Sequence, residues 1–592
     1  MHPKTQLARL IALALAPAIA ITLADTAAAQ TATAQALPTA PTLLPSLTVA
    51  GGTTKTIDTT TKLQQLKLGS GAALVAPAGK SLTLTVGGIG LPIKAGTYCC
   101  DVVLTVTDNI DVSYSSGSPG GASETLNHVL RTGVYIDNGA RVASKSVAAI
   151  VSEGTVSNSA AKGVYIESRE PKFNGFIVTG LSNYTITDPT ILLYGNGGND
   201  FVGFGAGIKA DGYAKVKVDG AYIYAKGAIR TAMFAGGNST LDVNNSFIDV
   251  RNGTLPSDYS FTVATGKLME VPWVLGLAGN NRATNLVGSA TATYTASRIR
   301  AQGWGALSTD DTTKVRLKAK DSRIEVTQSG YGAYSIGDSV DTFDNCRINV
   351  ADMALIMANG AASGTFTNGT VVNSGRFGVM MHSNSGGTLI VNKGSVINSK
   401  EASIQLKSSS PTIIVNKARL VPANGLLIQA VVNDDPYMTE LGFPASGSEV
   451  NATFRDTSLV GDIVNGNTVA AGVTTRLYNT RLLGAITQAT TTHQTADDGT
   501  ALSMAHPELY KLVGAFTHSY ASTGSSFPVD VTLGGSSEWI VNRTSYLTKL
   551  TIGANASVVA ASGKTLTMTV DGVNTSIVPG RAYSGAIVLT VS

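Results

Sequence analysis

The sequence contains few charged residues and few cysteines, and each shortage excludes a class of protein. Charged residues make up 14% of the 592 and the formal net charge is +4. Because such a composition lacks the basic stripe that follows a phosphate backbone, we expect no nucleic-acid partner. Three cysteines cannot form a disulfide framework. Cys99 and Cys100 are adjacent, where a ring-forming disulfide is strained, and we expect Cys346 to be buried and unpaired. Neither ligand spacing nor nearby histidines favour a metal site at these cysteines, and we expect no cofactor.

Long apolar runs are also scarce, and the one that stands out lies at the start of the chain. Lys4 and Arg9 precede the apolar run 10–23, and three alanines at 27–29 follow it. This order predicts a signal peptide over residues 1–29. The alternative, an anchoring helix, is disfavoured because the run is shorter than the roughly 20 residues that span a bilayer. We therefore predict an extracytoplasmic protein, which is periplasmic, on the cell surface or secreted. It would have no membrane span after signal removal and no attached barrel of amphipathic strands.

The sequence does contain a short repeat, which consists of a small or polar residue, any residue, and then an aliphatic one. Its copies are Ser297-Arg298-Ile299, Ser322-Arg323-Ile324, Cys346-Arg347-Ile348, Thr370-Val371-Val372, Ser395-Val396-Ile397 and Ala418-Arg419-Leu420. Their aliphatic members follow one another at steps of 25, 24, 24, 25 and 23 residues. An alternating strand such as Leu317-Lys318-Ala319 precedes each copy, and a Gly-marked turn and a second strand such as Gly378-Val379-Met380 follow it. A period of this length with strands in each copy predicts a solenoid.

This pattern resembles the right-handed parallel β-helix proteins, a large bacterial group that includes pectin-active enzymes, phage tailspikes and passenger regions of secreted adhesins. Four segments also resemble an uncharacterised secreted branch of that group: Val271-Pro272-Trp273, Gly279 to Asn285, Ser308-Thr309-Asp310-Asp311 and Arg376-Phe377-Gly378-Val379. The resemblance covers roughly residues 60 to 592. It implies an all-β fold, a right-handed parallel β-helix solenoid, and it indicates little about chemistry.

A strand-rich segment near the N-terminus reappears at the far end of the chain. Residues 79–86 match 563–570, and the stretch 98–107 matches the last ten residues, 583–592. Related modules on both sides of a solenoid predict caps, because open end coils would expose unpaired backbone. We therefore divide the chain into a signal peptide (1–29), a mobile leader (30–60), an N-terminal cap (61–107), the parallel β-helix (108–486), a long loop region (487–528) and a C-terminal cap (529–592).

The alternation of strand residues predicts two outward lines of side chains along the coils. Counting from the Gly or small residue after each turn gives Thr309, Ile336, Ala358, His382, Lys407 and Gln429 as one line, and Leu307, Tyr334, Ile356, Met380, Gln405 and Leu427 as the other. An outward face this apolar requires a cover or a ligand. Three stretches exceed the repeat length, namely 256–272, 433–448 and 487–528. These loops are the expected cover.

The candidate catalytic residues are carboxylates and one histidine on this face. Asp311 and Asp338 fall at the same level of neighbouring coils, about 4.8 Å apart, a distance at which one carboxylate raises the pKa of the other and separates an acid from a base. The alternative is that both cap Gly-rich turns. Asp310 is adjacent and would serve instead of Asp311. His382 is the only histidine between Tyr294 and Gln429. It is either a proton shuttle near neutral pH or a hydrogen-bonded surface residue.

The candidate binding residues surround this set. Lys407 and Arg282 would bind an anionic group or polarise a carbonyl, and otherwise they are solvated charges. Asn280 and Asn281 are either a turn ladder or a substrate contact. The predicted substrate face runs from Trp304 past Tyr334 to Gln429.

The order Asp310-Asp311, Asp338, His382, Lys407 loosely resembles the pectin hydrolases of this fold. The Asn-Thr-Asp, Gly-His-Gly and Arg-x-Lys elements of those enzymes are missing, however. No dense acidic cluster that would hold Ca²⁺ in a metal-dependent lyase is present either.

These residues lead to three functional hypotheses. The first is an exported β-helix enzyme that uses side-chain acid/base catalysis without an organic cofactor. By fold analogy it would be a lyase or hydrolase of carbohydrate. The second is elimination or isomerisation of a small, less polar substrate. The third is a non-catalytic surface or adhesin-like protein whose repeats only display loops.

Overall fold

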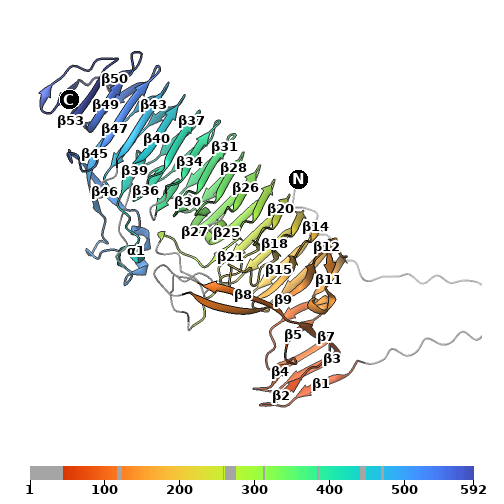
Figure 1. Ribbon diagram of the computed structural model, residues 1–592. Coiled ribbons are helices and arrows are strands. Elements are labelled where there is room, and N and C mark those ends of the chain that lie inside the picture. The colour runs from red at the N-terminus through yellow and green to blue at the C-terminus, as the bar shows by residue number, and fades with distance from the viewer. Residues whose placement is uncertain are drawn as a thin grey trace, which may run out of the picture. The chain divides into compact units, whose positions relative to one another are not determined.

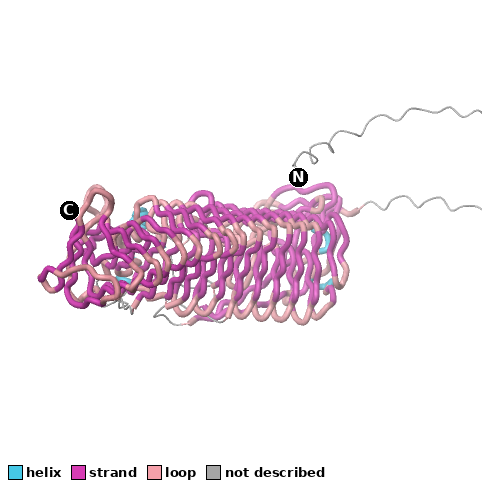
Figure 2. The backbone as a smooth tube through the Cα atoms, turned by 90° about the horizontal axis from the view of Figure 1, so that it is seen from above, coloured by secondary structure: helices cyan, strands magenta, loops and turns pink. Residues whose placement is uncertain are grey.

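A computed structural model describes residues 44–116, 123–257, 259, 275–310, 314–382, 386–440, 449–467 and 472–592. The predicted signal peptide, Asp311, Trp273 and most of the loop 256–272 lie outside these residues. Within the described part, strands stack coil upon coil into three parallel sheets (Figures 1 and 2). The all-β solenoid predicted from the repeat is confirmed.

Each coil passes through the three sheets in the same order. Sheet 1 contains β14 (Asn183–Thr187), β17 (Lys215–Asp219), β20 (Thr240–Asn244), β24 (Thr291–Thr295), β26 (Arg316–Lys320), β28 (Val340–Asp344), β31 (Ser363–Thr367), β34 (Thr388–Asn392), β37 (Thr412–Asn416), β40 (Val450–Arg455), β43 (Val473–Tyr478) and β47 (Val529–Gly534). Sheet 2 contains β15 (Thr190–Tyr194), β18 (Tyr222–Lys226), β21 (Phe247–Arg251), β29 (Arg347–Val350), β32 (Val371–Ser374), β35 (Val396–Ser399), β38 (Arg419–Pro422), β41 (Ser458–Val460), β44 (Arg481–Leu483) and β48 (Glu538–Val541).

Sheet 3 contains β9 (Glu124–Asp137), β13 (Phe173–Thr179), β16 (Ile208–Ala210), β19 (Met233–Ala235), β23 (Thr284–Leu286), β30 (Met353–Ala358), β33 (Val379–His382), β36 (Ile404–Lys407), β39 (Leu426–Val431), β42 (Asp462–Asn465) and β45 (Ile486–His493). The long strands β25 (Arg298–Thr309) and β27 (Arg323–Ile336) run through both sheet 2 and sheet 3.

The turn from sheet 1 to sheet 2 explains the small polar residue of the repeat. The Ser322 hydroxyl accepts the backbone N–H of Ser297 at 3.1 Å, and the Thr370 hydroxyl accepts that of Cys346 at 3.0 Å. The residue before it has a left-handed backbone, with φ of 54° at Asn345, and this conformation suits Asn. The Cys346 thiol occupies the hydroxyl position in this ladder, where it is buried and free. The prediction of a buried, unpaired Cys346 is confirmed.

Apolar side chains fill the interior of the coils, with one carboxyl among them. Asp341 is fully buried in β28, between Leu317 and Gly364 of the neighbouring coils. Burial raises the pKa of Asp341 well above its ordinary value, although the Thr309 hydroxyl opposes the shift.

Because of this shift, we expect Asp341→Asn to stabilise the protein at pH 7–8. The unfolded state releases the Asp341 proton near pH 4 and the folded state releases it at higher pH, so wild-type stability falls as pH rises between the two pKa values. Asn mimics the protonated acid. The gain in the free energy of unfolding, about 1 kcal/mol or more at pH 8, should therefore shrink toward pH 4. Thermal unfolding of both proteins from pH 4 to 8 measures it, with the exposed Asp338→Asn as control. A pH-independent difference would contradict the prediction.

The two end modules have the same strand pairing. In the first, β3 (Thr61–Leu68) pairs antiparallel with β7 (Gly96–Asp108), and in the second β49 (Ser545–Ile552) pairs with β53 (Ala582–Val591). Both ladders contain a bulge at the equivalent place, between Leu63 and Gln65 and between Leu547 and Lys549. The related strand-rich modules at both ends are therefore present.

The first module begins earlier than the sequence analysis placed it. Residues 46–60, assigned to the mobile leader, contain the strands β1 (Ser46–Val49) and β2 (Thr54–Thr56). Ser46 pairs with Gln65 in the same way that Asp530 pairs with Lys549 in the second module. Sequence matching missed this pair because few residues are identical there.

Loops cover the outward face of sheet 3 (Figure 1). A second apolar cluster, separate from the interior, contains Ala228, Ile229, Leu277, Trp304, Tyr331, Met353, Ile356, Phe377, Met380 and Ala402. Arg376 on this face donates to the carbonyls of Gly276 and Val513, at 3.4 and 2.6 Å. The Gln405 amide donates to the Gly514 carbonyl at 3.4 Å. The expectation that loops cover this face is confirmed for the described segments.

The register of the two outward lines needs correction at their ends. Ser308 pairs with Tyr334, so Leu307 and Thr309 face the interior and Asp310 takes the outward place. Gln429 pairs with Gln405, whereas Lys407 pairs with Val431. The error arose because Ser403 directly precedes Ile404, whereas Gly425 lies three residues before Ile428, the pairing partner of Ile404. Counting from the small residue therefore shifts the line by two residues. The middle of the line was correct, since Ala358 pairs with His382.

Candidate functional site

Several predicted site residues form a buried ion-pair cluster under the cover of sheet 3. The Arg282 guanidinium pairs with Asp310 and, at 2.7 Å, with Asp200 from the loop before β16. It lies over the Trp304 ring, with 4.3 Å between the guanidinium carbon and the ring centroid. Arg282, Asp200 and Trp304 are all buried. Burial raises the pKa of Asp200, and Arg282 opposes the shift. The structure thus brings Asp310, Arg282 and Trp304 together as a buried contact between a loop and the solenoid.

A second buried cluster joins His382 and Lys407 to two other loops. The Lys407 ammonium pairs with Asp434 at 2.7 Å, and His493 bonds the other oxygen of the same carboxylate at 2.8 Å. That oxygen also accepts the backbone N–H of Gly514 at 2.6 Å. Asp434 comes from the loop after β39, and Gly514 follows the short helix η4 (Pro507–Leu512). One carboxylate therefore fastens two loops to the solenoid.

Burial and neighbouring charges set the protonation states in this second cluster. Burial, with help from Lys407, lowers the pKa of His382 to about 3, so its imidazole is neutral near pH 7. Burial would raise the pKa of Asp434, but Lys407 and His493 lower it well below its ordinary value. Burial lowers the pKa of His493, but its bond to Asp434 outweighs this and raises it. Near pH 7 the cluster thus contains an ionised carboxylate beside Lys407.

The remaining predicted site residues lie apart from both clusters. Asp338 is exposed beside Gly337, which has a left-handed backbone. The Asn280 amide donates to the Gly253 carbonyl at 2.8 Å, and the Asn281 amide donates to the Gly227 carbonyl at 2.9 Å. These bonds join Asn280 and Asn281 to backbone carbonyls of neighbouring turns and correspond to the turn-ladder alternative. Gln429 is buried under the cover, and Tyr334 lies partly buried 5.6 Å from the Tyr331 ring.

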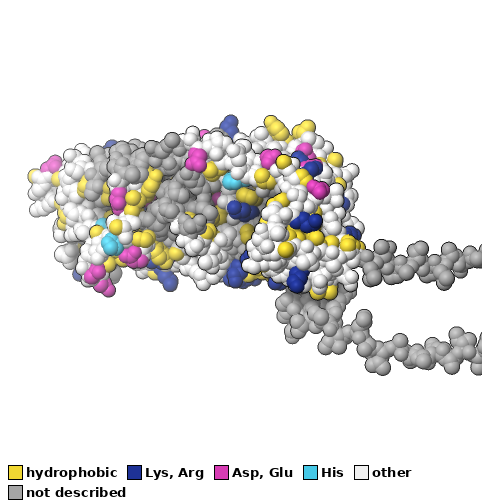
Figure 3. Space-filling model, turned by 90° about the horizontal axis from the view of Figure 1, so that it is seen from below, with side chains coloured by type: hydrophobic (Ala, Val, Ile, Leu, Met, Phe, Trp, Pro, Cys, Tyr) yellow, Lys and Arg dark blue, Asp and Glu magenta, His cyan; other side chains and the backbone are white. Residues whose placement is uncertain are grey.

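Figure 3 views the molecule from the covered side. Over the described part of this face, hydrophobic side chains appear in small groups among polar atoms and backbone. Of the predicted catalytic and binding residues, Asn281, Arg282, Trp304, His382, Lys407 and Gln429 are buried beneath this face.

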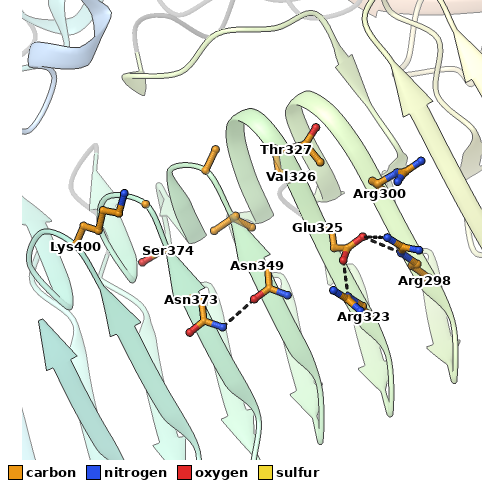
Figure 4. A pocket seen from close by; sticks show the side chains of 13 residues that line it. Arg298, Arg300, Arg323, Glu325, Val326, Thr327, Asn349, Asn373, Ser374 and Lys400 are labelled. Carbon is orange, nitrogen blue, oxygen red and sulfur yellow. Dashed lines mark hydrogen bonds and ion pairs between the residues drawn. The ribbon is translucent and has the colours of Figure 1, made fainter. Parts of the chain in front are cut away.

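An open groove lies elsewhere, over the outward face of sheet 2 (Figure 4). Its volume is about 640 Å³, and it crosses five successive coils, from β25 to β35. Arg298, Arg300, Arg323 and Lys400 supply its cationic side chains, and Asn349 and Asn373 its amides. We name it the sheet 2 groove.

Carboxylates beneath the arginines hold them in position. Glu325 pairs with Arg298 at 2.7 Å and also with Arg323, as the dashed lines in Figure 4 indicate. The Arg300 guanidinium donates to Asp249 at 3.1 Å, and this bond raises the pKa of Arg300. Glu325 is 10% exposed, whereas Arg298 and Arg323 are 43% and 55% exposed. The groove therefore presents guanidinium groups to solvent and keeps its carboxylate below them.

Comparison with known proteins identifies the fold of these coils. The family described as right handed beta helix region matches residues 304–433, which include most of the sheet 2 groove and both outward lines. The solenoid is a right-handed parallel β-helix. A comparison with curated proteins gives no match, so it names no activity for the chain.

One further feature extends the groove along the β-helix axis, and another runs within it. On the N-terminal side, Phe247 lies 5.8 Å from Tyr222, and the guanidinium of Arg298 lies 5.1 Å from the Phe247 ring. On the C-terminal side, the Asn373 amide donates to Asn349 at 2.8 Å and the Asn398 amide donates to Asn373 at 2.9 Å. Aromatic rings, guanidinium groups and an amide ladder thus follow one another on the same face.

Sequence reasoning missed this groove although its residues were in the repeat. Arg298 and Arg323 of the groove, and Arg347 on the next coil outside its lining, are the middle members of three consecutive repeat units, where they were treated as variable positions. An overall net charge of +4 conceals such a local gathering of arginines. Reading the middle member of each unit as its own outward line would have found it.

The described residues contain no group of three or more His, Cys, Asp or Glu side chains placed to hold a metal ion. Within the same residues, none of the helices has the length and hydrophobicity needed to cross a membrane.

Proposed function

We propose that this β-helix works outside the cytoplasm as an adhesin-like binding protein, and that an acidic polysaccharide lies in the sheet 2 groove. One observation carries the proposal: in an open groove, the exposed Arg298 and Arg323 pair on successive coils, and the amides of Asn349 and Asn373 pair on the next two coils. Because coils stack about 4.8 Å apart, these groups present a regular line to an extended chain. This proposal keeps the non-catalytic, adhesin-like role of the third hypothesis but places binding on the coils themselves, whereas that hypothesis had the repeats only display loops.

The side chains of the groove favour a ligand that is both anionic and rich in hydroxyl groups. Among the described lining residues, four cations face one carboxylate. Guanidinium groups bind carboxylates and sulfates through paired N–H donors. The Asn349–Asn373 ladder offers donors and acceptors that suit hydroxyls. DNA suits the groove less, because its phosphodiester backbone carries no free hydroxyl groups for the Asn349–Asn373 ladder.

The groove predicts that Arg298→Gln/Arg323→Gln lowers affinity for polygalacturonate at least about tenfold, since each charge-assisted bond contributes about 1.5–3 kcal/mol. Binding of the wild type should also weaken with added salt. Titration calorimetry measures both effects. Arg581→Gln is the control, because Arg581 is an exposed arginine of the C-terminal module outside the groove. The proposal would be refuted if the double variant and the wild type bound polygalacturonate with equal affinity. It would also be refuted if the wild type bound dextran or DNA as tightly as polygalacturonate.

Acid/base catalysis on carbohydrate remains a second candidate, supported by a different observation. His493 is 27% exposed while it bonds the buried Asp434, so one titratable member of the second cluster reaches solvent. The pair is a histidine oriented by a carboxylate, an arrangement typical of general bases. Product release from polysaccharides by wild type, abolished in His493→Gln, would establish this candidate. The binding proposal expects no product.

A further inference from the structure

A second pocket lies near the C-terminal end of the β-helix, at the turn from sheet 2 to sheet 3. Its volume is about 430 Å³, and its polar lining includes Asn424, Asp462, Tyr520, Asn542 and Arg543. The Tyr520 hydroxyl donates to one Asp462 oxygen at 2.7 Å, and the backbone N–H of Ala485 donates to the other at 2.7 Å. The carboxylate is thus already satisfied by the protein.

Arg543 differs from the other charged group in this pocket because it is held loosely. Its guanidinium lies 3.4 Å from Asp462 and 5.7 Å from the Tyr520 ring centroid, and its side chain is 58% exposed. Asp462 by contrast is 6% exposed. The accessible charge of the pocket is therefore positive, and exposed Asn424 and Asn542 amides flank it.

This pocket begins where the sheet 2 groove ends. Lys400, the last lining residue of the groove, directly follows Ser399, and Ser399 pairs with Pro422 on the next coil. Asn424, the first lining residue of the pocket, lies two residues after Pro422. The groove and the pocket are therefore on consecutive coils along the same edge of the β-helix, about 4.8 Å apart at their closest coils.

We infer that the Arg543 pocket is a second subsite of one polysaccharide track, which continues from the sheet 2 groove. This inference rests on the proposed function. Five coils of the groove span about 19 Å, and the track from β25 to β48 spans about 38 Å, at about 4.8 Å per coil. A chain that fills only the groove cannot reach Arg543. A longer chain binds both subsites at once, and the second contact is then intramolecular.

The test compares galacturonate oligomers of about 20 Å with polygalacturonic acid of 40 Å or more. We expect Arg543→Gln to weaken binding of the long polymer about tenfold and to leave binding of the short oligomer unchanged. Asn424→Ala/Asn542→Ala should have the same selectivity with a smaller effect. Arg581→Gln, an exposed arginine of the C-terminal module, is the control, and unchanged melting temperatures exclude misfolding.

The possible outcomes separate this inference from the proposed function. Selective loss of long-polymer binding in Arg543→Gln supports the second subsite. Unchanged binding of both ligands in Arg543→Gln, together with loss of both in Arg298→Gln/Arg323→Gln, overturns the subsite and leaves the groove intact. Wild type that binds neither ligand overturns the proposed function and the subsite together.

Discussion

Replacing Arg282 with methionine should lower the free energy of unfolding by about 3–5 kcal/mol, because it leaves buried carboxylates without their cation. Arg282 pairs with both Asp200 and Asp310, and all three side chains lie under the cover of sheet 3. Methionine fills a volume similar to that of arginine. The loss of stability therefore comes mainly from the missing charge and less from altered packing. Urea unfolding followed by tryptophan fluorescence measures it, since Trp304 stacks on the guanidinium.

The pH dependence of this loss distinguishes an uncompensated charge from a packing defect. Burial already raises the pKa of Asp200 against the opposing effect of Arg282, so removing Arg282 should raise it further. The folded variant then takes up a proton at higher pH than the unfolded chain, and its deficit should shrink as pH falls toward 4. Arg481→Met, which breaks an exposed pair, should cost less than about 1 kcal/mol. A similar small cost for Arg282→Met would refute the account.

Much of the fold could be predicted because a solenoid repeats its local chemistry. The small polar residue of each unit has one structural task, which is to bond the backbone of the preceding coil, as Ser322 and Thr370 do. That task recurs once per coil, so it leaves a period in the sequence. The end modules left a comparable signal because their ladders, bulge included, are built twice.

The partners of the candidate site could not be predicted, because loops supply them and loops have no period. Asp200 precedes Arg282 by 82 residues, and Val513 follows Arg376 by 137. Outward position was inferred for His382 and Lys407 from alternation, and it was correct. Outward position did not mean exposure, however, since covering loops bury both side chains. Hydrophobic neighbours such as Ile356 and Met380 were the available signal for that cover.

The distribution of charge shows a second limit of prediction from the sequence. Overall composition argued against any basic stripe, and yet the coil register places Arg298, Arg323 and Arg347 in one line. A period of about 24 residues converts distant arginines into neighbours about 4.8 Å apart. Average charge therefore excludes a basic protein and does not exclude a basic groove.

Replacing Lys407 with methionine should release two loops together, because Lys407 compensates the buried Asp434 carboxylate that holds them. Asp434 bonds His493 and the Gly514 backbone as well. Without Lys407 the carboxylate keeps its burial penalty and loses its nearest cation, at an expected cost of about 3 kcal/mol. Since a solenoid need not unfold in one step, hydrogen exchange is the sharper measurement, with faster exchange expected at Gly514 than in β36.

A second substitution in the same cluster tests whether charge is the cause. Asp434→Asn keeps the shape of the side chain and removes its charge, so Lys407→Met/Asp434→Asn should recover part of the protection lost in Lys407→Met alone. In wild type, Lys407 and His493 hold the pKa of Asp434 below its ordinary value against the effect of burial. Its stabilising contribution is therefore present above about pH 4 and declines as pH falls below the unfolded-state pKa. The double variant should lack that decline. If the double variant exchanged faster than Lys407→Met, the bonds of the Asp434 carboxylate to His493 and Gly514 would be holding the loops, and the ion pair with Lys407 would not.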